Sequence, residues 1–120
     1  LKSISKAAFS GCTALKKASV ASPVFKVLGV RAFASCTRLK SVSLASPVFK
    51  KLGGKSFLDC ASLSKLTLKS TLLAQTGVGE QAFAGSSPAM QVRVPTGFAK
   101  LYRKWFRAQG LAKTARVTTF

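Results

Sequence analysis

The chain has no histidine, and its only acidic residues are Asp59 and Glu80. General acid–base catalysis needs two titratable side chains that face the same reacting group. The two carboxylates occupy unrelated positions of the repeat described below, and no histidine is present to act as a base. We therefore expect no enzymatic activity and no small-molecule substrate.

Cysteine is also scarce, and the spacing of Cys12, Cys36 and Cys60 excludes its usual functional roles. Neighbouring cysteines are 24 residues apart, whereas metal ligands come in closely spaced pairs that histidine often completes. An odd number of cysteines leaves one thiol without a disulfide partner, and a nucleophilic thiol would lack a base. We expect a column of small buried thiols, with no metal and no cofactor.

Negative charge and long apolar runs are missing as well. Twenty Lys and Arg residues against two acidic ones give a net charge of +18, which favours binding to polyanions unless the charge serves only solubility. No apolar run reaches the roughly 20 residues of a membrane-spanning helix, and no signal peptide is visible. Hydrophobic residues make up 48% of the 120 residues, which is enough for one domain with a buried core.

What the sequence does contain is a repeat of 24 residues. Each copy carries Phe, Cys and Leu at three-residue intervals, with two apolar residues ahead of them. A fourth copy follows a two-residue insertion and has Ser86 and Ala89 in place of Cys and Leu. One coil of this length cannot bury its own apolar edge, so we expect the coils to stack and share a core. The recurring residues are Leu1, Ile4, Phe9, Cys12 and Leu15, then Phe25, Leu28, Phe33, Cys36 and Leu39, then Phe49, Leu52, Phe57, Cys60 and Leu63, and finally Val78 and Phe83.

Each copy also contains a short stretch in which apolar and polar residues alternate. Residues 41–45 read SVSLA, and KASVA, KLTLK and QVRVP stand at the matching places. Alternation predicts a strand, with Val42 and Leu44 facing the core. The SPVF that follows two of these stretches predicts a turn. Residues 31–36, RAFASC, do not alternate, so we expect a short helical or 3₁₀ turn on the opposite side of each coil.

These residues resemble the BspA-like, or Treponema-type, leucine-rich repeat. Its Ala-Phe-x-x-Cys-x-x-Leu core stands at 8–15 and 32–39, and at 56–63 with Ser56 in place of the alanine. The resemblance covers residues 1–95 as about four coils. It implies an α/β-type solenoid, a right-handed superhelix with a parallel sheet on its concave face. It also implies an adhesin-like protein of the bacterial surface or periplasm that binds host-matrix proteins, with an extracellular, cell-surface or periplasmic location.

Residues 96–120 depart from the repeat and predict a C-terminal cap. Thr96 is a candidate N-cap and Gly110 a helix stop, so we expect an amphipathic helix at 98–109. An extra strand within TARVTTF, at 114–120, is expected after it. A helix lying on an anionic membrane is the minor alternative. The apolar stripe of this helix comprises Phe98, Leu101, Tyr102, Trp105 and Phe106, and the basic face Lys100, Arg103, Lys104 and Arg107.

Two surfaces are candidate binding sites. The outward strand residues predict a ligand-binding face without an aromatic anchor, which suits an acidic protein partner better than an apolar one. Lys2, Lys26 and Lys50 share one offset in successive coils and predict a polyanion-binding ladder for glycosaminoglycan or nucleic acid. A structural segment without a ligand, and self-association through the uncapped first coil, are the alternatives. The ligand-binding residues predicted for the strand face are Lys17, Ser41, Ser43, Lys65, Thr67, Lys69, Gln91 and Arg93.

Overall fold

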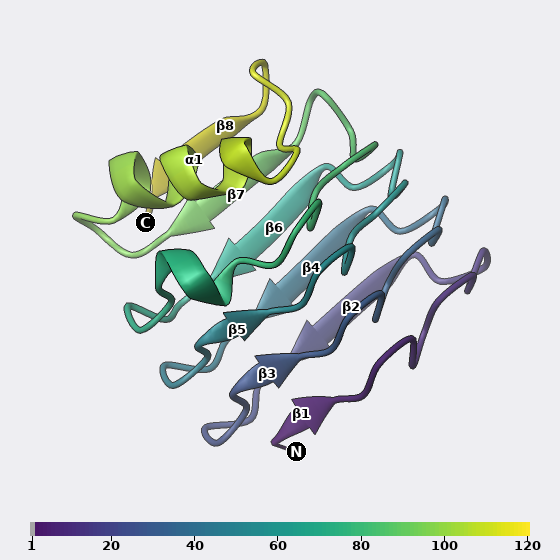
Figure 1. Ribbon diagram of the computed structural model, residues 1–120, viewed down its shortest axis with the longest axis horizontal. Coiled ribbons are helices and arrows are strands. Elements are labelled where there is room, and N and C mark those ends of the chain that lie inside the picture. The colour runs from purple at the N-terminus through teal and green to yellow at the C-terminus, as the bar shows by residue number, and fades with distance from the viewer. Residues whose placement is uncertain (1) are drawn as a thin grey trace.

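The computed structural model describes residues 2–120, so Leu1 of the predicted apolar column lies outside the described residues. The chain forms coils that lie parallel to one another, and the order of the coils along the stack follows the sequence (Figure 1). The elements in chain order are β1 (Ser3–Ile4), β2 (Lys17–Val20), β3 (Val27–Leu28), β4 (Ser41–Leu44), β5 (Lys51–Leu52), β6 (Lys65–Leu68), the 3₁₀ helix η1 (Gln75–Gly77), β7 (Gln91–Val94), α1 (Ala99–Ala108) and β8 (Arg116–Thr119).

One wall of the stack is a five-stranded parallel sheet in the order β2-β4-β6-β7-β8. Its register repeats the sequence period, because Val42 pairs with Ala18 on one side and with Leu66 on the other. Val42 and Leu44 are buried, as the alternation predicts. The predicted strand in the C-terminal tail is β8, which pairs with β7 in parallel.

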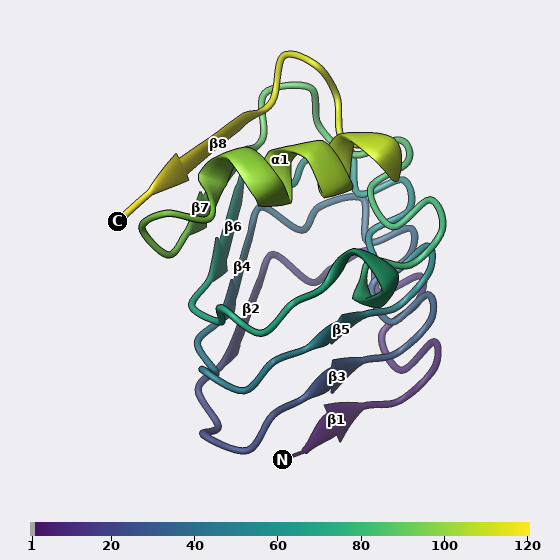
Figure 2. The ribbon, with the colours of Figure 1, turned by 60° about the vertical axis from the view of Figure 1, so that its left-hand side comes forward.

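The second wall is a three-stranded parallel sheet, β1-β3-β5, that the sequence did not reveal. Figure 2 shows the two sheets on different sides of the stack, joined by the turns that close each coil. Each of these strands is two residues long, which is too short for alternation to be recognised. Their second residues, Ile4, Leu28 and Leu52, are the buried column that precedes the phenylalanines.

The third side of each coil consists of turns, and the expected helical or 3₁₀ turn at 31–36 is wrong. The amides of Arg31, Phe33 and Ser35 donate to carbonyls of the next coil, at 2.7 to 2.9 Å. A helix would use these amides within its own segment. Arg31 and Ser35 also have positive φ angles of 58° and 59°, which break a right-handed helix at every fourth residue. Hydrogen bonding between coils therefore decides this conformation.

A glycine column brings the coils into close contact where β3 and β5 end. A Cβ atom built on Gly53 would lie 2.5 Å from the carbonyl carbon of Gly29, and one on Gly79 would lie 2.1 Å from the amide nitrogen of Gly54. No side chain fits at these distances. The glycines looked scattered in the sequence, but this column is a spacing requirement of the stack.

Stacked phenylalanine rings form the centre of the core. The ring centroids of Phe33 and Phe57 are 5.8 Å apart with an interplanar angle of 2°, and both side chains are buried. The first coil differs from the expectation: Phe9 is 41% exposed, and Cys12 and Leu15 are only half-buried, because among the described residues they have a neighbouring coil on one side only.

The fourth coil and the terminal helix correct four further expectations. Met90, not Ala89, fills the position of the repeat leucine and is buried. Phe98 precedes α1 as its N-cap residue without a side-chain hydrogen bond, so Thr96 is not the cap. The helix ends one residue earlier than expected, and Gly110 follows it with a φ of 98°. Leu101 is 42% exposed, so the buried stripe is narrower than predicted.

Candidate binding surfaces

The outward residues of the five-stranded sheet form one continuous surface, which we call the strand face. Lys17, Ser41, Lys65, Gln91 and Arg116 follow one another across the five strands in register. The parallel row one step along comprises Ser19, Ser43, Thr67, Arg93 and Thr118. Lys69 comes directly after β6. The structure therefore places the predicted ligand-binding residues on or beside one face, and their binding role stays a prediction.

The structure gathers four of these residues more closely than the others. Lys65, Thr67, Gln91 and Arg93 line a depression of about 140 Å³ between β6 and β7. Lys17, Ser41 and Ser43 lie outside it, toward the N-terminal coil. Thr67 contributes a hydroxyl group between the charged ends of Lys65 and Arg93, so the depression combines hydrogen-bond donors with positive charge.

An aromatic ring also lies beside the strand face, which corrects the expectation that this face has none. Phe120 is 50% exposed, and its ring lies 5.0 Å from the guanidinium carbon of Arg93 and 5.9 Å from the Nζ atom of Lys69. Its amide donates to the carbonyl of Val94, which continues the β7–β8 pairing. The sequence hid this contact because Phe120 follows Arg93 by 27 residues.

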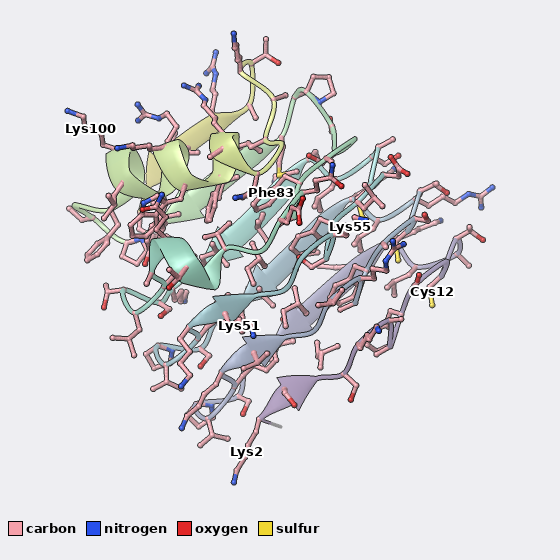
Figure 3. The ribbon with its side chains drawn as sticks, viewed as in Figure 1. Lys2, Cys12, Lys51, Lys55, Phe83 and Lys100 are labelled. Atoms are coloured by element: carbon pink, nitrogen blue, oxygen red, sulfur yellow. The ribbon has the colours of Figure 1, made fainter. Side chains whose placement is uncertain are left out.

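The lysine ladder lies on a different side of the molecule, at the start of the three-stranded sheet. The amide of Lys26 donates to the carbonyl of Lys2 at 2.8 Å, and the amide of Lys50 donates to the carbonyl of Lys26 at 2.9 Å. All three residues are exposed, and the labelled Lys2 side chain points away from the stack (Figure 3). The predicted stacking is present, and the binding of a polyanion to it stays a prediction.

The thiols lie along the inner side of the turns. The Sγ atom of Cys36 donates to the carbonyl of Phe9 at 3.1 Å, and that of Cys60 donates to the carbonyl of Phe33 at 3.0 Å. Burial raises the pKa of both thiols, that of Cys60 to about 12. A thiol that keeps its proton is a poor nucleophile and a poor metal ligand. Among residues 2–120, no group of three or more His, Cys, Asp and Glu side chains lies close enough to bind a metal ion.

The N-terminal end of the stack presents an apolar cavity of about 450 Å³. Ile4, Phe9, Leu15 and Phe33 contribute to its lining, and Lys17 stands at its edge. This is the surface for which self-association was expected. The structure describes the cavity and holds nothing within it that tests the expectation.

Comparison with known proteins gives one match. The family model described as "BspA type Leucine rich repeat region (6 copies)" matches residues 1–113, which includes the repeats, α1 and the loop after it. No curated protein and no solved structure matches the chain. In the described part of the chain, no helix has the length and apolar character needed to cross a bilayer.

Proposed function

The chain belongs to the family of BspA-type leucine-rich repeat proteins, and from this premise we propose that it binds an acidic protein ligand through the strand face. Leucine-rich repeats of this family are generally non-catalytic and mediate protein interactions. Stacked repeats present a broad and rigid surface that needs little rearrangement on binding. The proposal concerns which surface binds and what chemistry it recognises.

The observation that carries the proposal is the composition of the strand face around the depression. Lys65 and Arg93 supply positive charge, Thr67 and Gln91 supply neutral hydrogen-bonding groups, and Phe120 supplies a ring at the border. Arg and aromatic residues are the side chains that most often contribute strongly to protein–protein binding. Because neither carboxylate of the chain lines this depression, a partner with Asp or Glu side chains would complement it electrostatically.

The finer parts of the proposal follow from the family. We infer a right-handed superhelix whose strand face is concave, with residues 1–95 as the repeat array and 96–120 as the cap. We also infer an adhesin-like role on the bacterial surface or in the periplasm, with proteins of the host matrix as ligands. The packing of α1 against β7 and β8 supports the cap, since Tyr102 and Phe106 are buried there.

The experiment measures binding of the chain to purified extracellular-matrix proteins by surface plasmon resonance. The test variant is Lys65→Glu combined with Arg93→Glu, and the matched control is Lys2→Glu combined with Lys26→Glu, which makes the same charge change on the ladder. We expect the strand-face variant to lose binding and the ladder variant to keep it. Equal losses in both variants would show that net charge, not the strand face, determines the interaction.

A second candidate function is polyanion binding by the lysine ladder, and the stacking of Lys2, Lys26 and Lys50 favours it. Like charges held on neighbouring coils repel one another, and a linear polyanion would relieve that repulsion. Competition distinguishes the two functions. Heparin and DNA should block a generic polyanion binder equally, whereas a protein ligand on the strand face should be displaced less by either.

A further inference from the structure

A basic groove lies between α1 and β8, apart from both the strand-face depression and the lysine ladder. It has a volume of about 310 Å³. Figure 3 shows nitrogen-tipped side chains gathered around α1, on the side of the labelled Lys100. Four of the groove's eight lining residues are cations, and none is acidic or aromatic. The lining consists of Arg103, Arg107, Lys113, Thr114, Ala115, Arg116, Val117 and Thr118.

The four cations have no counter-charge within the described residues. Arg107 makes one side-chain hydrogen bond, from Nη2 to the carbonyl of Lys113 at 3.0 Å, and this bond ties the loop after α1 to the helix. In the described chain, Arg103, Lys113 and Arg116 have no side-chain hydrogen bond and no ion pair. The guanidinium donors of Arg103 and Arg116 are therefore available to an anion from outside the chain.

Neutral donors lie in the same groove. The amides of Arg116 and Phe120 donate toward β7, to the carbonyls of Met90 and Val94. Because successive amides of a strand point to opposite sides, the amide of Val117 points away from β7, at the free edge of the sheet. The hydroxyl of Thr118 makes no hydrogen bond in the described chain, whereas that of Thr114 already donates to the carbonyl of Pro88.

We propose that the groove between α1 and β8 binds the sulfate groups of a sulfated glycan. Guanidinium groups bind such oxyanions in bidentate fashion, and the amide and hydroxyl donors complete their hydrogen bonding. The site depends on the α1–β8 packing and not on the strand face, so it is independent of the protein ligand proposed above.

Two other polyanions fit the groove less well. Recognition of single-stranded nucleic acid uses aromatic side chains on which bases stack, and no aromatic residue lines the groove. A helix that lies on a membrane inserts its apolar face, whereas Tyr102 and Phe106 of α1 are buried in the core. Sulfate groups need only cations and hydrogen-bond donors, which the groove supplies.

The test is calorimetric titration of the chain with a size-defined heparin octasaccharide. The groove variant is Arg103→Gln combined with Arg116→Gln, because neither side chain makes a bond that the fold needs. The matched control is Lys2→Gln combined with Lys26→Gln, which removes the same charge from the ladder. We expect the groove variant to bind about tenfold more weakly, since two charge-assisted contacts are lost, and the control to change by less than about threefold. Circular dichroism melts verify that both variants are folded.

Three comparisons decide against the proposal. If the two variants weaken alike, net charge binds the glycan, and the groove cations serve only to keep the β8 edge from pairing with other chains. If a DNA oligonucleotide of equal charge binds as tightly and the groove variant loses it equally, the groove is a generic polyanion site. If the octasaccharide binds no better than its desulfated form, while phosphatidylserine vesicles bind through Arg103 and Arg116, the ligand is a lipid headgroup. None of these outcomes bears on the strand face, which is tested by its own variant.

Discussion

Replacement of Phe57 by alanine tests whether the phenylalanine column holds the coils together. Phe57 has no exposed surface, and its ring lies between those of Phe33 and Phe83, with centroid distances of 5.8 and 5.9 Å. Truncation removes the ring from both contacts and leaves a cavity enclosed by two coils. We expect a loss of about 3–5 kcal/mol in the free energy of unfolding, as for other buried Phe→Ala changes.

Phe9 provides the matched control, because it occupies the same offset of the repeat but is 41% exposed. Its ring stacks on Phe33 alone, at a centroid distance of 5.4 Å. Full burial of such a side chain contributes about 1.5–3 kcal/mol, so partial burial without an enclosed cavity predicts a loss of about 1–2 kcal/mol for Phe9→Ala. The two variants should therefore differ by roughly 2 kcal/mol.

Urea unfolding followed by circular dichroism measures both variants against the parent. With the slope typical of a small domain, a difference of about 2 kcal/mol moves the midpoint by roughly 1 M. Equal losses for the two variants, or a loss below about 1.5 kcal/mol for Phe57→Ala, would refute the reasoning. Equal losses that depend on protein concentration would instead show that a second molecule covers the first coil.

Three further predictions concern side chains inside the stack and on its surface. Ser56→Ala should raise the free energy of unfolding by about 1 kcal/mol, because the Ser56 hydroxyl is buried without a hydrogen-bond partner in the described chain; an unchanged urea midpoint would contradict this. Half-buried Cys12 should react with a soluble thiol reagent before buried Cys60; because burial raises the pKa of Cys60 from 9.0 to about 12, its contribution to stability should be constant below about pH 9 and decline toward pH 12, since the unfolded chain loses the proton first. Lys26→Glu combined with Lys50→Glu should raise the melting temperature at low salt and weaken heparin binding; unchanged heparin binding would exclude the ladder as the site.

Local pattern was sufficient for the repeat and the strands of the strand face. Val42 and Leu44 alternate with serines, and that alternation fixes which side of the strand is buried wherever the strand lies. The identical spacing of Phe33 and Phe57 likewise required parallel coils in register. The two-residue strands and the turns were not recognised, because Arg31, Phe33 and Ser35 owe their conformations to partners in the next coil.

The sequence by itself determined the repeat, the inward and outward sides of the four longer repeat strands, the buried column of thiols and the excess of positive charge, because each of these is a property of residues at a fixed period. The tertiary structure decided where that charge is concentrated. Arg103 and Arg116 meet across one groove only because α1 packs on the last coil and β8 returns beside β7, and Phe120 reaches Arg93 for the same reason. Contacts of this kind join segments that share no period, so only the packed chain reveals them.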